Sequence, residues 1–407
     1  MGKPTILIII PNLGQGGAQS IFRHHMHHLS LHFKVIGCVF NWDGAFETDK
    51  SENVISLDVP GGKTWVHKTY YFILRIIKLR HLKREMKIDV SISHLEGADY
   101  VNLLSRGSEK VICWIHGTKK FDESIKGLLG LVRHHILMPL LYRRAEKIIT
   151  VSRGIQDEFK NSFKGVEGLL GTIYNGFDVE DIQKLSLEEA DGDFIELCQK
   201  SKVVITHCRL SKQKNLTALV HIFSELVKTS SIKLVIIGDG ELRQELLDEC
   251  KNSGLKTSTC WENLAWSDSC DVYFLGQQQN PFKYLRHASL YIMTSNWEGF
   301  PLAVCEAMVC KLPVIASDCY TGPREILSPE ITSPQPVSKP YYATFGLLMP
   351  LANIDTNPSI KVWANEVQRL MENTAQMNKY SKEGIERIKE FDLDSIMAQT
   401  VELVETI

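Results

Sequence analysis

Short apolar runs, rich in β-branched residues, alternate along the chain with longer segments of helical periodicity. This alternation predicts parallel strands joined by helices, because strands buried on both faces read as continuous apolar runs. The expected strands form two sets. The first set is residues 5–10, 34–39, 90–93, 111–115 and 147–151, and the second is residues 203–207, 234–237, 271–275, 290–293 and 313–316. The pattern therefore predicts an α/β protein with two doubly wound, Rossmann-like domains.

The segment between the two sets of strands, residues 181–202, is acidic and poor in strand signals. We expect it to link an N-terminal domain of residues 1–180 to a C-terminal domain of residues 203–385. A chain of 407 residues with 44% hydrophobic content is long enough for two such domains. Open parallel sheets bind ligands beyond the carboxyl ends of their strands, so the two domains are expected to face a central cleft.

Composition favours a cytoplasmic protein. Charged residues interrupt every apolar stretch before the ~18 to 20 residues that a membrane-spanning helix needs. Residues 5–10 run straight into Pro11 and a glycine turn, as a first strand does and a signal peptide does not. The ten cysteines include no Cys-x-x-Cys pair, so they fit small buried side chains in a reducing compartment.

Two glutamates flank a predicted strand-to-helix junction after the strand of residues 290–293. Glu298 lies in the loop, Gly299 allows a tight bend, and Pro301 fits the first helical position because its missing N–H needs no partner there. Glu306 follows within the helix. Carboxylates accept hydrogen bonds from hydroxyls, and a partly positive helix end attracts phosphate. This corner therefore suits a sugar nucleotide. The alternative is a solvated loop acid and an ordinary helix residue.

Arg209 and Lys214 follow the apolar strand of residues 203–206, where they are expected to project from its end. Two cations there can stabilise the charge of a departing diphosphate, Arg as a planar fork and Lys as a point charge. The alternative is a solvated basic loop in which Lys212 is a third member.

A glycine turn, with Gly14, Gly16 and Gly17, follows the first strand. Gln19 stands where a dinucleotide-binding fingerprint needs its third glycine, so an NAD-dependent oxidoreductase is disfavoured. Glycine permits close backbone approach, so the turn can meet a donor phosphate or an acceptor. A strand-to-helix turn without a ligand fits the same residues.

Histidines raise two questions, a ligand contact at one strand end and a metal site on the first helix. His116 ends the strand of residues 111–115, although a lone histidine is more often structural. The first predicted helix carries a cluster of histidines, which are His24, His25, His27, His28 and His32. No cysteine or carboxylate in the sequence pattern completes a metal shell around them.

Two Asp-x-Asp pairs raise the question of a metal-held donor. Asp191 and Asp193 lie in the predicted linker without a preceding strand, and Asp392 and Asp394 lie near the C-terminus. Both pairs fit turn and cap positions better. We therefore expect metal-independent chemistry.

Taken in order, these landmarks resemble the retaining glycosyltransferases of family 4, which have the two-domain GT-B fold. The matching runs are residues 14–17, 114–117, 150–152, 174–178, 209–215, 238–240, 298–306 and 321–326. The resemblance spans nearly the whole chain, and it implies that the C-terminal helical segment, residues 386–407, packs back near the hinge. It is closest to bacterial enzymes of surface-polysaccharide, lipopolysaccharide or lipid-linked oligosaccharide synthesis.

The resemblance implies a transfer of hexose or N-acetylhexosamine from a nucleotide sugar, expected to be UDP-linked, to a glycan or polyprenyl-diphosphate-linked acceptor. His116 and Glu298 would contact the transferred sugar, and Glu306 would hold the ribose. A donor phosphate oxygen would take the acceptor proton, with retention. The residues expected to bind the nucleotide sugar are Gly16, Gly17, Arg209, Lys214, Gly238, Gly299, Phe300, Pro301, Leu302 and Glu306. No further cofactor and no nucleic acid are implied.

Two alternatives stay open at this point. A UDP-N-acetylglucosamine 2-epimerase shares the two-domain shape, but its extra acid and base groups have no evident place in the sequence. A non-catalytic sugar-nucleotide-binding homologue is the other, and the presence of Arg209, Lys214, Glu298 and Glu306 speaks against it. A donor-hydrolysis assay separates these cases.

Basic and apolar residues interleave over residues 70–87, and a similar stretch runs over residues 128–144. The basic members of the first stretch are Arg75, Lys78, Arg80, Lys83, Arg84 and Lys87. This is the composition of interfacial helices, so we expect the N-terminal domain to dock peripherally on an anionic membrane surface. The alternative is that the apolar stripes pack on the sheet while the charges face water.

Overall fold

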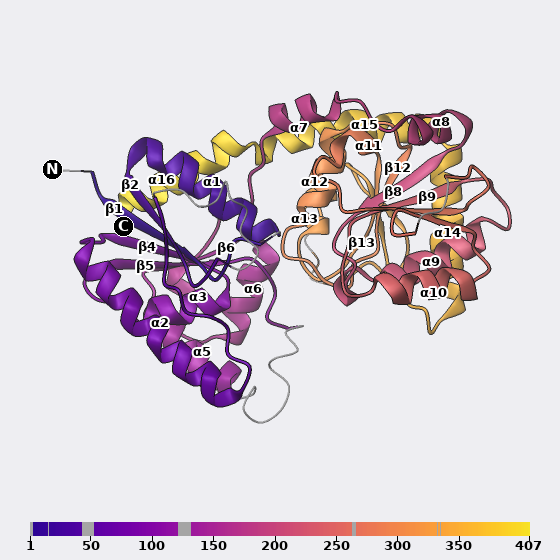
Figure 1. The fold of residues 1–407 in the computed structure, drawn as a ribbon. Helices are drawn as coiled ribbons and strands as arrows, with labels where there is room; N and C mark the ends of the chain where they lie inside the picture. The colour runs from indigo at the N-terminus through magenta and orange to yellow at the C-terminus, as the bar shows by residue number, and fades with distance from the viewer. Residues whose placement is uncertain are drawn as a thin grey trace. The chain divides into compact units, whose positions relative to one another are not determined.

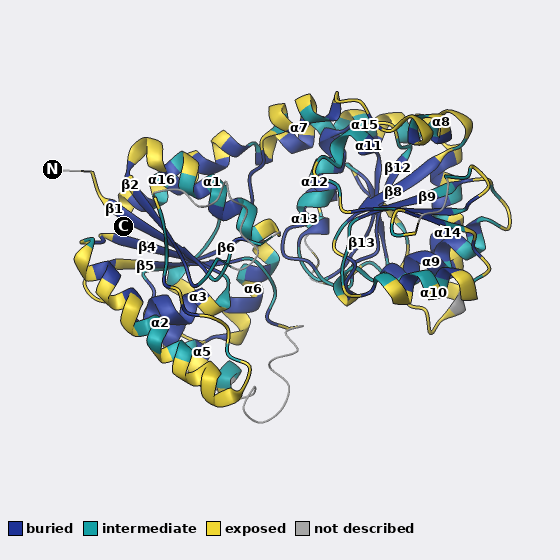
Figure 2. Ribbon diagram, viewed as in Figure 1, coloured by how far each residue is buried: buried dark blue, intermediate teal, exposed yellow. Residues whose placement is uncertain are grey.

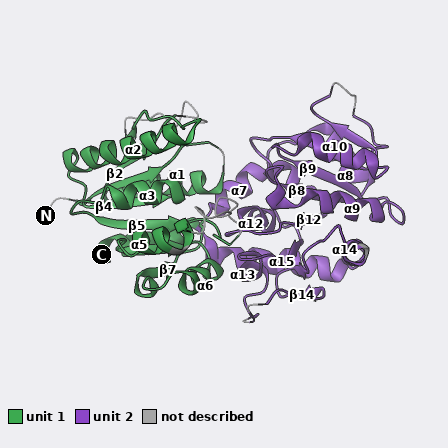
Figure 3. Ribbon diagram, turned by 90° about the horizontal axis from the view of Figure 1, so that it is seen from below, with its two compact units in different colours: residues 1–176, 393–407 green, residues 177–392 purple. Residues whose placement is uncertain are grey.

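The computed structural model describes residues 3–14, 16–42, 53–120, 132–262, 266–331, 333 and 335–407. The chain divides into two compact units (Figure 3). Unit 1 combines residues 1–176 with 393–407, and unit 2 is residues 177–392. Each unit contains one sheet covered by helices on both faces, so the predicted doubly wound α/β fold is confirmed (Figure 1).

Unit 1 has a seven-stranded sheet in which neighbouring strands are parallel. In spatial order the strands are β3 (Val54–Ser56), β2 (Lys34–Val39), β1 (Thr5–Ile10), β4 (Val90–His94), β5 (Lys110–Ile115), β6 (Lys147–Thr150) and β7 (Leu170–Thr172). Every residue of β1 is buried, which explains its unbroken apolar run. The sequence pattern did not predict β3 and β7, the two short edge strands.

Helices cover both faces of this sheet. They are α1 (Gly17–His32), α2 (Trp65–Glu85), α3 (Glu96–Leu104), a π-helical turn (Arg133–Leu137) that continues into α5 (Met138–Tyr142), α6 (Arg153–Ser162), a 3₁₀ turn (Glu167–Leu169) and α16 (Leu393–Thr406). The helices α1 and α16 lie on one face, and α2, α3 and α5 lie on the other (Figure 1). The C-terminal helix α16 thus belongs to unit 1, where it packs against α1.

Unit 2 has an eight-stranded sheet, antiparallel only at its β14 edge. In spatial order the strands are β10 (Thr257–Thr259), β11 (Val272–Gly276), β9 (Lys233–Ile237), β8 (Val203–His207), β12 (Leu290–Met293), β13 (Val314–Ser317), β15 (Leu347–Met349) and β14 (Tyr341–Tyr342). Its helices are α7 (Val179–Ser186), α8 (Gly192–Lys200), α9 (Leu216–Leu226), α10 (Arg243–Asn252), α11 (Phe282–Leu285), α12 (Leu302–Val309), α13 (Pro323–Leu327), α14 (Asn357–Glu372) and α15 (Thr374–Ile388), with 3₁₀ turns at Lys212–Lys214 and Lys389–Phe391.

Two expected boundaries differ from the structure. Residues 181–202, expected as a linker, lie within unit 2, where α7 packs against α11 and α12. Asp178 caps α7 by accepting a hydrogen bond from the Asp181 amide at 2.8 Å. The expected C-terminal segment, residues 386–407, is not one helix, because α15 ends at Ile388 and a turn separates it from α16.

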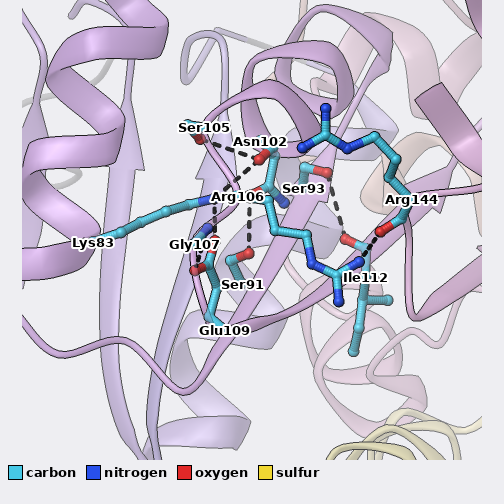
Figure 4. A network of polar contacts seen from close by, with 10 residues as sticks. All are labelled: Lys83, Ser91, Ser93, Asn102, Ser105, Arg106, Gly107, Glu109, Ile112 and Arg144. Atoms are coloured by element: carbon cyan, nitrogen blue, oxygen red, sulfur yellow. Dashed lines mark hydrogen bonds and ion pairs between the residues drawn. The ribbon is translucent and has the colours of Figure 1, made fainter.

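A buried polar network holds α2 to the sheet (Figure 4). The Lys83 ammonium lies 2.8 Å from Glu109 Oε1 and 2.6 Å from Asn102 Oδ1, and the side chains of Lys83 and Glu109 are only 3% and 4% exposed. Burial lowers the pKa of Lys83 to about 8, against the opposing pull of Glu109. Lys83 was expected among the basic residues of a docking surface. It is instead an internal ion-pair partner.

Candidate active site

Glu298 is held at the junction between β12 and α12 in unit 2. Its side chain is 6% exposed, and the Lys214 ammonium lies 2.7 Å from its Oε1. Gln213 Nε2 donates to its Oε2 at 3.3 Å, and its backbone N–H donates to the Tyr320 carbonyl at 3.1 Å. Burial acts to lower the pKa of Lys214, but the charge and hydrogen bond of Glu298 raise it overall. Glu298 is therefore not a solvated loop acid.

The Lys214 turn is locked to the end of β12, the strand next to β8. The Thr294 hydroxyl donates to the carbonyls of Lys214 and Asn215, each at 3.1 Å. The backbone N–H of Asn296 donates to the backbone carbonyl of Gln213 at 2.8 Å. Asn215 adopts a left-handed conformation with φ of 50°, which asparagine tolerates better than most residues. Neighbouring strands thus bring together Lys214 and Glu298, which are far apart in the chain.

Glu306 pairs with a histidine that sequence reasoning did not select. His207 Nε2 lies 2.6 Å from Glu306 Oε2. His207 is the last residue of β8, and Glu306 lies in the second turn of α12, which begins beside β12. The signal in the sequence was a polar residue ending a buried strand, the same signal that singled out His116.

Arg209 does not join this cluster in the structure. Its side chain is 74% exposed and makes an ion pair with Glu241 at 3.1 Å. Gly238 lies in the facing loop after β9, with φ of +136°, and a Cβ there would lie 1.9 Å from the Cys208 carbonyl oxygen. Close packing of two loops therefore requires glycine at position 238. Its expected contact with a donor remains a prediction.

The loop from Gly299 to Leu302 packs against the turn that follows β13. Pro301 precedes α12, whose first residue is Leu302, one position later than expected. Gly322 has φ of +90°, and a Cβ there would lie 2.6 Å from the Pro301 ring. The Thr321 hydroxyl donates to the Glu298 carbonyl. Phe300 packs edge-on against Phe391, with ring centroids 5.1 Å apart.

His116 lines a cavity of about 210 Å³ in unit 1, at the carboxyl ends of β4 and β5. Its Nε2 lies 2.8 Å from Nδ1 of His94, the last residue of β4. Burial, followed by the nearby charge of Lys119, lowers the pKa of His116 to about 3. The His116 imidazole is therefore neutral at physiological pH.

Two carboxylates that sequence reasoning missed line the same cavity, Glu96 and Asp99. Lys119 Nζ lies 2.6 Å from Glu96 Oε2, and Arg133 lies 2.8 Å from Glu96 Oε1. Burial opposes ionisation of Glu96, yet Lys119 and its other partners bring its pKa below the usual value. Asp99 accepts hydrogen bonds from Ser93 and Tyr142, while burial raises its pKa to about 7.

Gly16 and Gly17 stand at the start of α1, while Gln15 between Gly14 and Gly16 lies outside the described residues. Of the histidines on α1, His25 is wholly buried, with its ring edge-on to Trp114 at 4.5 Å. Within the described ranges, no three His, Cys, Asp or Glu side chains are placed to hold a metal ion. None of the described helices has the length and apolar character that a membrane crossing requires.

Two protein families match successive parts of the chain. Residues 15–181 match the family described as Glycosyltransferase Family 4. Residues 191–334 match the family described as Glycosyl transferases group 1. The first match lies almost wholly in unit 1, and the second lies in unit 2.

Curated relatives and a solved structure align over most of their length. An uncharacterised glycosyltransferase of Methanocaldococcus jannaschii is 30% identical over 83% of this chain and 83% of its own. The N-acetylgalactosamine-N,N'-diacetylbacillosaminyl-diphospho-undecaprenol 4-alpha-N-acetylgalactosaminyltransferase of Campylobacter jejuni is 26% identical over 78% of this chain and 82% of its own. The crystal structure of Anabaena HepE in complex with UDP-glucose superposes with a TM-score of 0.74 at 19% identity, covering 99% of this chain and 100% of that chain.

Proposed function

We propose that this chain, which belongs to the glycosyltransferases of the GT-B fold, moves a hexose or N-acetylhexosamine from a UDP-sugar with retention. The acceptor we propose is a glycan or a polyprenyl-diphosphate-linked glycan of a bacterial polysaccharide pathway. The UDP-glucose of the Anabaena structure supports the donor class, and the diphospho-undecaprenol in the Campylobacter relative's name supports the acceptor class.

One observation carries the proposal: Lys214 and Glu298 form a nearly buried ion pair at the ends of adjacent parallel strands. Ligands bind at this edge of an open α/β sheet. A donor diphosphate would draw the Lys214 ammonium to its own negative charge, which frees Glu298 to accept a hydrogen bond from a sugar hydroxyl. Glu306, already a hydrogen-bonding group toward His207, would accept from the ribose hydroxyls.

In the chemistry we propose, the protein positions the reactants and stabilises the developing charge. The acceptor oxygen attacks the anomeric carbon as the bond to the diphosphate breaks, and a donor phosphate oxygen takes the acceptor proton. Lys214 stabilises the departing diphosphate, an effect that grows where water is excluded. Arg209, exposed at the same strand end, is a second cation for that charge. In this scheme no metal ion is required.

Replacing Lys214 tests the proposal. Lys214→Ala should lower transfer from a UDP-sugar by about two to three orders of magnitude, as the loss of one preorganised electrostatic group does. Lys212→Ala is the matched control, because Lys212 lies in the same turn with an exposed side chain. Near-parental transfer by the Lys214 variant would refute the assignment.

We also propose that unit 1 docks peripherally on an anionic membrane, through a surface that differs from the expected one. Arg75 donates to the Val59 and Pro60 carbonyls, and Lys78 donates to the Leu57 carbonyl, so these bases hold α2 in place together with Lys83. The exposed apolar residues of α2 are Trp65, Val66, Tyr70, Ile73 and Ile77. Figure 2 shows that α2 is exposed along its outward side.

An anionic lipid surface fits this side of α2. Trp65 is 78% exposed, and aromatic side chains of this kind favour the membrane interface. Lys68, Arg80 and Arg84 are exposed on the same helix, whose one acid is Glu85. Four further exposed apolar residues lie at α5 and its preceding turn, on the same face of the sheet; they are Val132, Ile136, Leu137 and Leu140. Residues 128–131 of that stretch lie outside the described residues.

Flotation with vesicles tests the surface. The triple variant Trp65→Ser, Tyr70→Ser, Ile73→Ser should lose binding to phosphatidylglycerol vesicles that the parent shows at low salt. The matched control is Leu187→Ser, Leu351→Ser, Ile354→Ser, which removes three exposed apolar side chains from unit 2. Absence of parental binding, or equal binding by both triple variants, would refute the surface. Salt should weaken the parental binding because it screens the basic residues.

A further inference from the structure

His94 is a buried histidine beside the cavity of unit 1. Its side chain is wholly buried, and its Nδ1 lies 2.8 Å from Nε2 of His116. Its other nitrogen, Nε2, is buried without a hydrogen-bond partner in the described part of the chain. The rings around it are those of Phe22, His25 and Trp114, with centroids 5.0 to 6.2 Å away.

The unpartnered Nε2 decides where the protons of this histidine pair lie. Burial lowers the pKa of both His94 and His116 well below the ordinary value, so both rings are neutral and one proton lies between them. If His116 donated that proton, His94 would carry its own on Nε2, as a buried N–H without a partner. Buried N–H groups without partners are rarer than buried acceptors without them. The favoured arrangement has His94 donating from Nδ1.

His116 then carries its own proton on Nδ1. This nitrogen has no hydrogen-bond partner among the described residues, and His116 is partly exposed. His116 lines the cavity together with Glu96 and Asp99.

We infer that His94 is a positioning residue that fixes His116 as the Nδ1–H tautomer, so that His116 offers the cavity a hydrogen-bond donor. The ligand group that fits is an oxygen with a free lone pair, such as a sugar hydroxyl oxygen. The assignment of a sugar rests on the proposed function. The tautomer does not, because it follows from contacts within unit 1.

Histidine ¹⁵N NMR on the full chain tests the tautomer without any ligand. At pH 7.5 the parent should show a protonated Nδ1 and an unprotonated Nε2 for His116, assigned by loss of its signals in His116→Gln. His94→Asn places an amide donor near the position of the His94 Nδ1 and should keep this pattern. His94→Phe removes the donor, so His116 should no longer be held as the Nδ1–H tautomer and should show a mixture of both tautomers. A parental His116 protonated on Nε2 overturns the inference even if neither His94 variant folds.

Transfer kinetics test the consequence for the ligand. His94→Phe should lower kcat/KM by about 10- to 100-fold, the cost of one hydrogen bond, while His94→Asn should stay near the parent. A purely packing role for His94 predicts the opposite, because Phe fills the site better than Asn. A released tautomer with unchanged kcat/KM overturns the ligand contact. A parent that shows the expected tautomer but transfers no sugar overturns the proposed function and leaves the His94 assignment standing.

Discussion

Replacing His25 should change how the stability of unit 1 depends on pH. The His25 side chain is wholly buried in α1, and neither ring nitrogen has a partner among the described residues. Burial first, and then the neighbouring His116, His24 and His28, lower its pKa from 6.5 to about 3. Between these values the unfolded chain binds a proton at His25 that the folded chain does not. The free energy of unfolding therefore falls as pH falls from about 6.5 towards 3.

The size of the effect follows from the two pKa values. At pH 7.5 both states hold His25 neutral, so its contribution is close to zero. At pH 5.0 protonation of the unfolded state costs the folded state about 2 kcal/mol. His25→Phe keeps a flat ring against Trp114 but cannot take a proton. The loss of stability between pH 7.5 and pH 5.0 should therefore be about 2 kcal/mol smaller in the variant than in the parent.

Urea unfolding at the two pH values measures this difference. Hydrogen-exchange pulses at one fixed pH, read on the amides of β5, restrict the measurement to unit 1, which matters because the chain has two units. His32→Phe is the matched control, since His32 is exposed at the end of the same helix. An equal loss of stability in parent and His25 variant would refute the reasoning, because it would mean that His25 is protonated in the folded state.

Three further predictions concern the two units. Glu306→Ala should weaken binding of free UDP in calorimetry, whereas Glu298→Gln should spare UDP affinity and lower turnover; equal losses of affinity would contradict separate roles. Transfer should persist in excess EDTA, and activity that disappears on chelation and returns with manganese would show a metal-held donor. Lys83→Met should lower the free energy of unfolding of unit 1 by about 3 to 5 kcal/mol, because Glu109 is left buried and unpaired. Arg84→Met, at an exposed neighbouring position, should change it little, and equal effects of the two variants in urea melts would contradict the buried pair.

The strands that the sequence predicts are those buried on both faces. The run of residues 203–207 reads as a strand because every residue of β8 is buried. The strands that escaped prediction have two or three residues, such as β10 and β14, too few for a period to show. The helices α7 and α8 escaped because an acidic segment without strand signals also fits a linker. Only their packing in unit 2 distinguishes the two.

Candidate site residues were recognisable where they follow a buried strand, as His116 follows β5 and Glu298 lies in the loop after β12. Their partners were not, because a partner is chosen by sheet order rather than by sequence distance. Gln213 reaches Glu298 only because β8 and β12 are neighbours. The sequence also did not indicate which basic side chains face the interior. Lys83 is buried and Arg84 is exposed, although they are consecutive residues of one helix. Composition counts both as the same charge.

Each unit has a histidine that ends a strand, and the two histidines have partners of different charge. In unit 1 the histidine that ends β4 holds His116, a second imidazole, and burial keeps both neutral. In unit 2 the histidine that ends β8 faces Glu306, a carboxylate, and the next pair along the same edge is Lys214 with Glu298. A neutral imidazole pair suits hydroxyl groups, which need orientation more than charge, whereas charged pairs suit a diphosphate that gains charge as its bond breaks. In the function proposed above, unit 2 would use these charged pairs on the donor diphosphate, and its difference from unit 1 follows from the partner that each strand-end histidine meets.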